Sequence, residues 1–173
     1  MYNYYQCPFF NNPAYDDNTR ENPNRPADPY TYPGNFPEAI RLIEGAVAGE
    51  REDELFYDYL ISVAPTQEAK TIIMSIRDDE RRHNLMFRRL YTVLTGKVHP
   101  PNKPEGSFKK PESYCDGIRD ALMGELGAVQ RYRRILFALN NRVHINMLVE
   151  IITDELRHAS LYNYLFTSGR CMR

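Results

Sequence analysis

The feature of this 173-residue chain that most restricts its fold is an internal repeat. AVAGE at 46–50 matches ALMGE at 121–125, and DERRH at 79–83 matches DELRH at 154–158. The same offset of 75 residues, the separation of Glu50 and Glu125, brings Tyr57 onto Tyr132. The two halves therefore predict two copies of one structural unit.

The repeated unit has the periodicity of a helix. Apolar residues recur every three or four positions, which is typical of amphipathic helices, and no strand pattern competes. Pro65 interrupts the first apolar stripe, Thr66 is a suitable N-cap, and Gly96 is a suitable stop. We expect four helices: Pro37 to about Ala64, Thr66 to about Gly96, about Glu112 to the turn at Asn140, and Asn141 to about residue 168.

Each turn lies midway between two glutamates. The turn at Pro65 separates Glu50 from Glu80, and the turn at Asn140 separates Glu125 from Glu155. At 1.5 Å per residue, both acids of a hairpin lie about 22 Å from its turn, and so at one level.

The hairpins are joined by a proline-rich linker. A parallel arrangement of the second and third helices needs a return of about 45 Å, and some fifteen extended residues reach about 46–50 Å. We therefore expect an all-α fold, a ferritin-like four-helix bundle of two duplicated helical hairpins joined by a long crossover.

Polar side chains continue the apolar stripes at this common level. They are Glu50, Glu80, His83, Glu125, Glu155 and His158. Four buried carboxylates repel one another unless they are neutralised, and two divalent cations would cancel their charge. One glutamate from each of two helices plus Glu-x-x-His from the other two is a dinuclear carboxylate ligand set, and oxygen-rich donors suit iron or manganese. The alternative is a duplicated hairpin whose polar residues are solvated or otherwise satisfied.

The constellation resembles the ferritin-like di-iron carboxylate superfamily, with rubrerythrin and bacterioferritin as the nearest relatives, over residues 37–168. The resemblance implies two iron ions, with manganese as the other possibility. It also implies that Glu80 and Glu155 bridge the metals and that Glu50 and Glu125 are terminal ligands.

The resemblance further assigns two aspartates to the histidines. It implies that Asp79 accepts the Nδ1 proton of His158, and that Asp154 accepts that of His83. Nε2 of each ring would then be left for metal.

The chain departs from these relatives in two respects. Rubrerythrins carry a rubredoxin iron on paired C-x-x-C motifs, which Cys7, Cys115 and Cys171 cannot form. We expect no disulfide framework from them and a separate electron donor. Arg81 replaces the methionine expected for a bacterioferritin haem, so we expect no haem.

Three further residues are candidates for a catalytic role. Glu54 lies one turn from Glu50, where its repeat counterpart is Val129. It is a gate or occasional ligand, or alternatively a tolerated acid. Tyr57 and Tyr132 lie two turns from the terminal glutamates, as redox or hydrogen-bonding residues or as core aromatics.

The ends of the chain differ from residues 37–168. Residues 1–36 hold six Tyr, six Pro and seven Asn but no Ile, Leu or Val, so they cannot form an aliphatic core. We expect an extended arm, either a disordered tail or a segment that packs on a partner subunit. Residues 169–173 are a C-terminal tail.

The charge of the chain and its first residues limit the partners and the location that we expect. The net charge is −1 with acids and bases interleaved, so we expect neither a nucleic-acid nor a membrane partner. No basic segment followed by an apolar one begins the chain, so we expect no signal peptide and a cytoplasmic location. We also expect a homodimer.

These expectations favour an oxidoreductase that reacts with a small oxidant, peroxide or dioxygen. Two alternatives stay open. One is an iron-handling or storage protein, which needs a cage. The other is a structural or coat-type protein that acts through its N-terminal arm.

Overall fold

The structure is a computed structural model that describes residues 30, 32, 34–101, 108–169 and 171, without the side chains of Glu50 and Arg51. It is all-helical, and no strand occurs among the described residues. The five helices are α1 (Phe36–Ala48), α2 (Glu50–Val63), α3 (Gln67–Thr95), α4 (Tyr114–Phe137) and α5 (Arg142–Ser168).

Local sequence signals set most helix ends. The Thr66 hydroxyl accepts from the backbone N–H of Ala69 at 3.1 Å and begins α3. Gly96 ends α3 with a φ of 70°, which glycine adopts without strain. These predictions are confirmed.

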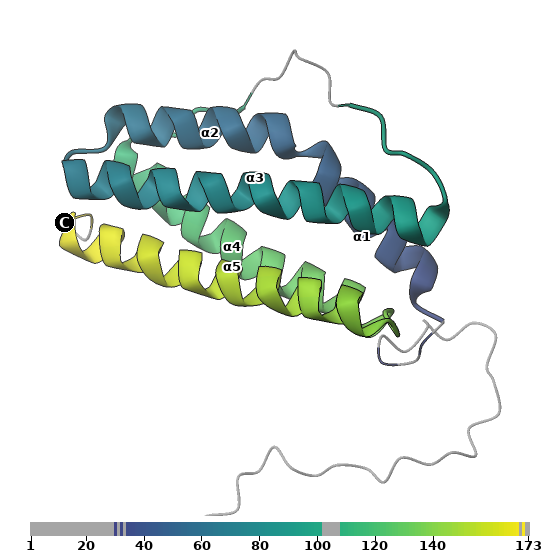
Figure 1. Ribbon diagram of the computed structural model, residues 1–173. Helices are drawn as coiled ribbons and strands as arrows, with labels where there is room; N and C mark the ends of the chain where they lie inside the picture. Colours follow the sequence, from purple (N-terminus) through teal and green to yellow (C-terminus); the bar gives the residue numbers. More distant parts are fainter. Residues whose placement is uncertain (1–29, 31, 33, 102–107, 170, 172–173) are drawn as a thin grey trace, which may run out of the picture.

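The expected first helix is divided, so that prediction is wrong in detail. Gly49 separates α1 from α2, and its N–H reaches the Gly45 carbonyl over 3.4 Å. Glycine lowers helix propensity because it has the most backbone freedom to lose, and Gly49 has no side chain that could cap α2. The two helices therefore meet at an angle (Figure 1). The third expected helix begins at Tyr114 instead of near Glu112, because Ser113 caps it.

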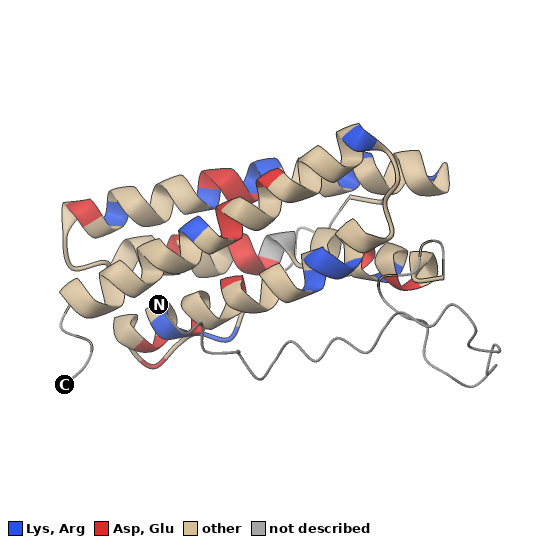
Figure 2. Ribbon diagram, turned by 90° about the horizontal axis from the view of Figure 1, so that it is seen from below, with Lys and Arg blue, Asp and Glu red and all other residues tan. Residues whose placement is uncertain are grey.

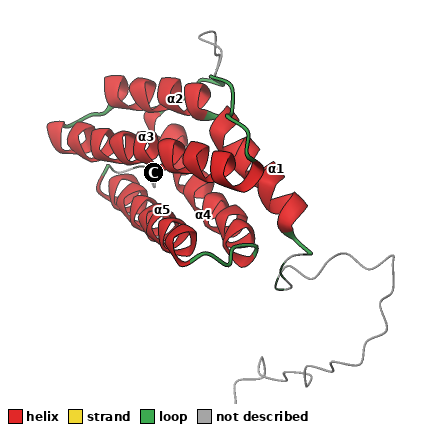
Figure 3. Ribbon diagram, turned by 45° about the vertical axis from the view of Figure 1, so that its right-hand side comes forward, coloured by secondary structure: helices red, strands yellow, loops and turns green. Residues whose placement is uncertain are grey.

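The helices lie side by side along their lengths. Both α1 and α2 contact α3, and α4 packs antiparallel against α5 (Figures 1 and 3). The end of α3 and the start of α4 lie at opposite ends of the molecule, so these two helices run parallel. The chain between them must therefore span the length of the molecule, as the length of the linker allows.

Two apolar clusters fill the interior, one toward each end. The first cluster includes Ile43, Val47, Phe87, Leu90, Ile135 and Leu148. The second includes Leu60, Ile73, Ile76, Ile118, Tyr162 and Leu165. Between them, α3, α4 and α5 each carry buried polar residues at the same level. The apolar core is thus interrupted by one polar layer.

Most of the expected N-terminal arm lies outside the described residues. At its described end, the Tyr30 ring packs on Phe137 with 4.9 Å between centroids. Asn140 Nδ2 donates to the Tyr32 hydroxyl at 3.3 Å. This part of the arm therefore contacts the turn between α4 and α5 of its own chain.

The expectation of no disulfide is wrong. Cys115 and Cys171 form one, with their Cα atoms 5.4 Å apart. The bond ties the chain that follows α5 to the first turn of α4. Two cysteines 56 residues apart show no spacing motif, and only the antiparallel pairing of α4 and α5 brings them together.

Candidate metal centre

The polar layer brings together side chains from three helices. Ligand atoms of Glu80, Glu125, Glu155 and His158 all lie within 4.8 Å of one another. Figure 2 shows acidic stretches of separate helices meeting near the middle of the molecule. Four of the six residues expected to bind metal are therefore gathered as one possible ligand set.

His83 joins this group from α3. Its Nδ1 is 3.3 Å from Glu155 Oε1 and 3.5 Å from Glu80 Oε1. His158 Nδ1 is 3.0 Å from Glu80 Oε1 and 3.9 Å from Glu155 Oε2. Glu80 and Glu155 thus each lie close to both imidazoles, whose stacked rings are 5.8 Å apart between centroids. The side chain of the sixth expected ligand, Glu50, lies outside the described part of the structure.

The central atoms of this site lack hydrogen-bond partners. Glu80 Oε1, Glu155 Oε1 and the Nδ1 atoms of both histidines are buried without a properly aligned hydrogen bond. Each such buried polar atom carries a desolvation penalty. Cations bound among these atoms would remove it, and the donor set of carboxylates plus two imidazoles fits iron or manganese.

The outer nitrogen of each imidazole faces an aspartate on the neighbouring helix. His83 Nε2 lies 3.1 Å from Asp154 Oδ2, and His158 Nε2 lies 3.3 Å from Asp79 Oδ2. The expected pairs therefore meet, but the expected nitrogen is wrong. Nδ1 is the ring nitrogen nearer the backbone, so it faces the glutamates of the layer, while Nε2 extends to the adjacent helix.

Burial and charge set the protonation of the layer. Burial raises the pKa of Glu155 to about 9, aided by its hydrogen bond with Glu125, and burial raises the pKa of Glu125 to about 7. Burial opposes the charged form of Glu80, but the nearby imidazoles of His158 and His83 lower its pKa. Burial opposes the charged form of His83, but Glu155 and Glu80 raise its pKa to about 10. Without metal, the layer holds protons where a cation would otherwise sit.

Two cavities lie beside the layer, one on each side of α2. One of about 230 Å³ lies toward α3, and one of about 220 Å³ lies toward α4. Both are lined by the same central residues: Asp53, Tyr57, Glu80 and Tyr132. The tyrosines therefore lie where a small molecule would approach the layer.

The candidate catalytic residues have distinct surroundings. The buried Tyr57 hydroxyl donates to Glu125 Oε1 at 3.5 Å. Tyr132 packs its ring 4.8 Å from that of Phe87. Glu54 accepts from Arg81 at 2.5 Å beside the larger cavity, so it is ion-paired and does not join the glutamates of the layer.

Asp53 is a further acid beside the layer, and it was not among the residues expected at the site. Part of its surface is open to solvent, yet burial of its carboxyl and the charge of Glu80 raise its pKa to about 6. A signal was present, because Asp53 lies one turn from both Glu50 and Tyr57, and its repeat counterpart Ala128 is buried. Unlike Glu50, which is repeated as Glu125, Asp53 is not repeated in the other half.

Comparison with known proteins places the chain in a family. No protein-family model matches it. The uncharacterized protein YhjR of Bacillus subtilis (strain 168) is 30% identical, in an alignment that covers 78% of this chain and 93% of YhjR. The chain belongs to the YhjR family. No activity is stated for YhjR, so the family relation leaves the chemistry to be argued from the residues.

A solved structure shares the fold of this YhjR-family protein. It is the crystal structure of a conserved hypothetical protein, rv2844, from Mycobacterium tuberculosis, with a TM-score of 0.65 and 13% identity. The match covers 77% of this chain and 93% of that chain. At this identity, the likeness shows the helical fold alone. Among the described residues, no helix combines the length and apolar character needed to cross a membrane.

Proposed function

We propose that this protein is a ferritin-like four-helix bundle that holds a dinuclear metal centre, with two iron ions or alternatively manganese, and reacts with peroxide or dioxygen. The observation that carries the proposal is the group of orphaned ligand atoms on Glu80, His83, Glu155 and His158, which point into one buried layer. An apolar core would pack this space at lower cost than four unpaired polar atoms.

The residues divide into two similar sets. Glu125 and His158 would serve one ion, and Glu50 and His83 the other, with Glu80 and Glu155 shared. When bound, the metal pair would supply two redox equivalents at one site. The glutamates would provide charge balance, and the flanking apolar clusters would exclude bulk water from both ends of the layer.

Nearby side chains would guide a small oxidant and its protons. Tyr57 donates a hydrogen bond to Glu125 and lies on the wall of both cavities, so it is placed to hold a proton next to the layer. The Glu54–Arg81 ion pair borders the larger cavity, where it would control entry. Electrons would come from a separate donor.

Metal content and single-turnover kinetics test this proposal. Protein produced with ample iron and manganese should contain two ions per chain, and the reduced iron form should react faster with hydrogen peroxide than with dioxygen in anaerobic stopped-flow mixing. One ion per chain, or zinc alone, would contradict the dinuclear site. Faster reaction with dioxygen and accumulation of many ferric ions per chain would favour iron storage. Failure to react with either oxidant would favour a structural role.

A further inference from the structure

Four charged residues form a closed ring on the seam between α3 and α5, outside the two histidines. They are Asp79 and Arg82 on α3, and Asp154 and Arg157 on α5. The second pair follows the first at the repeat offset, so the ring has the pseudo-twofold symmetry of the site.

Each arginine binds both aspartates. Arg82 donates to Asp79 Oδ1 at 2.9 Å and to Asp154 Oδ2 at 2.8 Å. Arg157 donates to Asp154 Oδ1 at 3.2 Å and to Asp79 Oδ2. In each aspartate, Oδ1 therefore binds the arginine of its own helix and Oδ2 binds the arginine of the other.

The Oδ2 atoms also face the imidazoles. Asp154 Oδ2 accepts from Arg82 while lying 3.1 Å from His83 Nε2, and both partners come from α3. Asp79 Oδ2 holds the corresponding place between Arg157 and His158 Nε2. Side chains of the aspartates are 16% and 17% exposed, and those of the arginines 48% and 46%, so the arginines cover the aspartates from the solvent side.

We propose that Arg82 and Arg157 are positioning residues that hold Asp79 and Asp154 across the seam, so that each aspartate accepts the Nε2 proton of the opposite histidine and both Nδ1 atoms face the layer. The proposal rests on the proposed function in one respect only, that the group bound by Nδ1 is a metal ion. A planar guanidinium bridges two carboxylates with fixed geometry, whereas a lysine ammonium is a single point of charge. The four charged residues would therefore fix the orientation of each imidazole as well as balance the charge beside it.

One contact makes the proton position worth measuring directly. Arg157 Nη2 lies 3.4 Å from His158 Nε2, close to the distance from that nitrogen to Asp79. A proton on Nε2 satisfies the aspartate, whereas a bare Nε2 would instead accept from the arginine. The proposal requires the first arrangement at both histidines.

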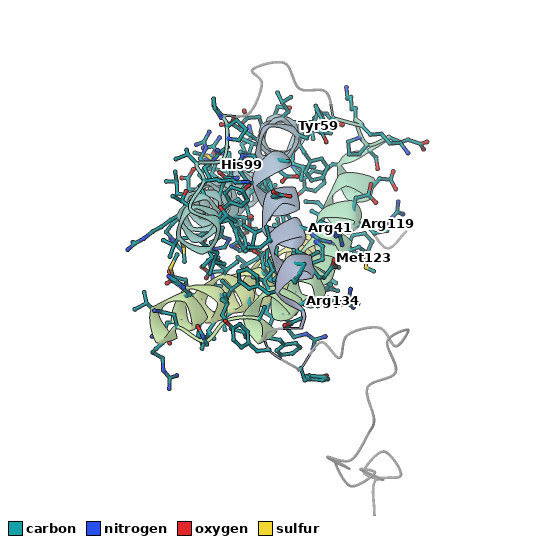
Figure 4. The ribbon with its side chains drawn as sticks, turned by 90° about the vertical axis from the view of Figure 1, so that its right-hand side faces the viewer. Arg41, Tyr59, His99, Arg119, Met123 and Arg134 are labelled. Carbon is teal, nitrogen blue, oxygen red and sulfur yellow. A yellow bond between two sulfur atoms is a disulfide. The ribbon has the colours of Figure 1, made fainter. Side chains whose placement is uncertain are left out.

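The test compares the full chain with Arg82→Gln, Arg157→Gln, the double variant and the two Arg→Lys variants. Arg41→Gln is the control, because Arg41 makes a similarly short ion pair with Glu38 on the exposed face of α1, where Figure 4 labels it. Long-range ¹H–¹⁵N NMR identifies the protonated ring nitrogens with and without Zn²⁺, a diamagnetic probe. Titration with Zn²⁺ measures the affinity.

In the zinc-loaded wild type we expect slowly exchanging protons on Nε2 of His83 and His158, and no proton on Nδ1 of either ring. The double glutamine variant should lose the slow exchange and bind Zn²⁺ at least about tenfold more weakly, the lower end of what loss of outer contacts to a metal ligand costs. The lysine variants should recover part of both, and Arg41→Gln should match the wild type.

The proposal is overturned if the double variant keeps both Nε2 signals and binds Zn²⁺ within twofold of the wild type. If circular dichroism shows that the double variant is unfolded, the lysine variants decide, since equality with the wild type in exchange and affinity overturns the proposal. If the wild type binds no Zn²⁺, the proposed function fails, while Nε2 proton exchange in the metal-free proteins still tests the ring.

Discussion

Glu155 faces both imidazoles of the layer, so one side chain would contribute to both ions of the proposed centre. It lies 3.3 Å from His83 Nδ1 and 3.9 Å from His158 Nδ1. We predict that Glu155→Ala loses both metals together, because a shared carboxylate contributes to each ion. Metal analysis by mass spectrometry checks this. Glu150→Ala, at an exposed position of the same helix, should keep two ions per chain. Two retained ions in Glu155→Ala would refute a bridging role.

The pH dependence of the metal-free protein follows from the same residues. Glu155, Glu125 and His83 have folded-state pKa values of about 9, 7 and 10, all above the values for an unfolded chain. The folded state then binds more protons than the unfolded state, so the free energy of unfolding should decrease as the pH rises from about 5 to 10. Below about pH 4.5, protonation of Glu80, whose pKa is lowered, reverses the trend.

Urea unfolding of the metal-free protein at pH 5, 7 and 9 measures this dependence. Glu155→Gln, which resembles the protonated side chain, should flatten the decrease between pH 7 and 9. Higher stability at pH 9 than at pH 5 would contradict the expected direction.

A glycine of α4 lies against the side chain of Leu60 in α2. A Cβ at Gly117 would lie 2.5 Å from Leu60 Cδ2, and Leu60 is fully buried. We predict that Gly117→Ala lowers the free energy of unfolding by about 1–3 kcal/mol, the usual cost of an overpacked core. Gly45→Ala in α1, where nothing lies within 4 Å of the added Cβ, should stabilise by about 0.5–1 kcal/mol. Thermal and urea unfolding of both variants tests the contrast.

The sequence was most informative where one residue controls one local structure. Thr66 and Gly96 were assigned correctly because capping needs a hydroxyl or a positive φ within the same turn. The break at Gly49 was missed because apolar residues continue on both sides of it and isolated glycines are tolerated in helices. The angle between α1 and α2 therefore depends on packing.

For the site, residue types and spacing predicted which residues come together, but not how their side chains are oriented. The repeat identified Glu80, Glu125, Glu155 and His158, which the structure groups together. Spacing does not determine which ring nitrogen faces inward, because that depends on the rotamer and the neighbouring helix. Asp53 was missed because the burial that raises the pKa of its carboxyl comes from tertiary packing, which residue spacing does not show.

At the scale of the whole molecule, the disulfide closes a loop over α4 and α5. Cys115 and Cys171 are 56 residues apart in sequence, and a crosslink over such a loop stabilises by about 2–4 kcal/mol, chiefly by restricting the unfolded chain. We predict that reduction, or Cys115→Ser with Cys171→Ser, lowers the free energy of unfolding by this amount. Urea unfolding with and without reductant measures it.

The double serine variant should be insensitive to reductant, and Cys7→Ser should behave as the wild type in both conditions. Equal stability of the oxidised and reduced wild type would show that the bond adds nothing to the fold.

The position of the polar layer between two apolar clusters has a consequence for transport. Among the described residues, apolar clusters pack on both sides of the layer along the long axis. The two cavities instead flank α2, the helix that begins after the break at Gly49. If the layer holds metal as proposed, small molecules would reach it from the side of the bundle, next to α2, and a partner that exchanges electrons with it would dock on that side.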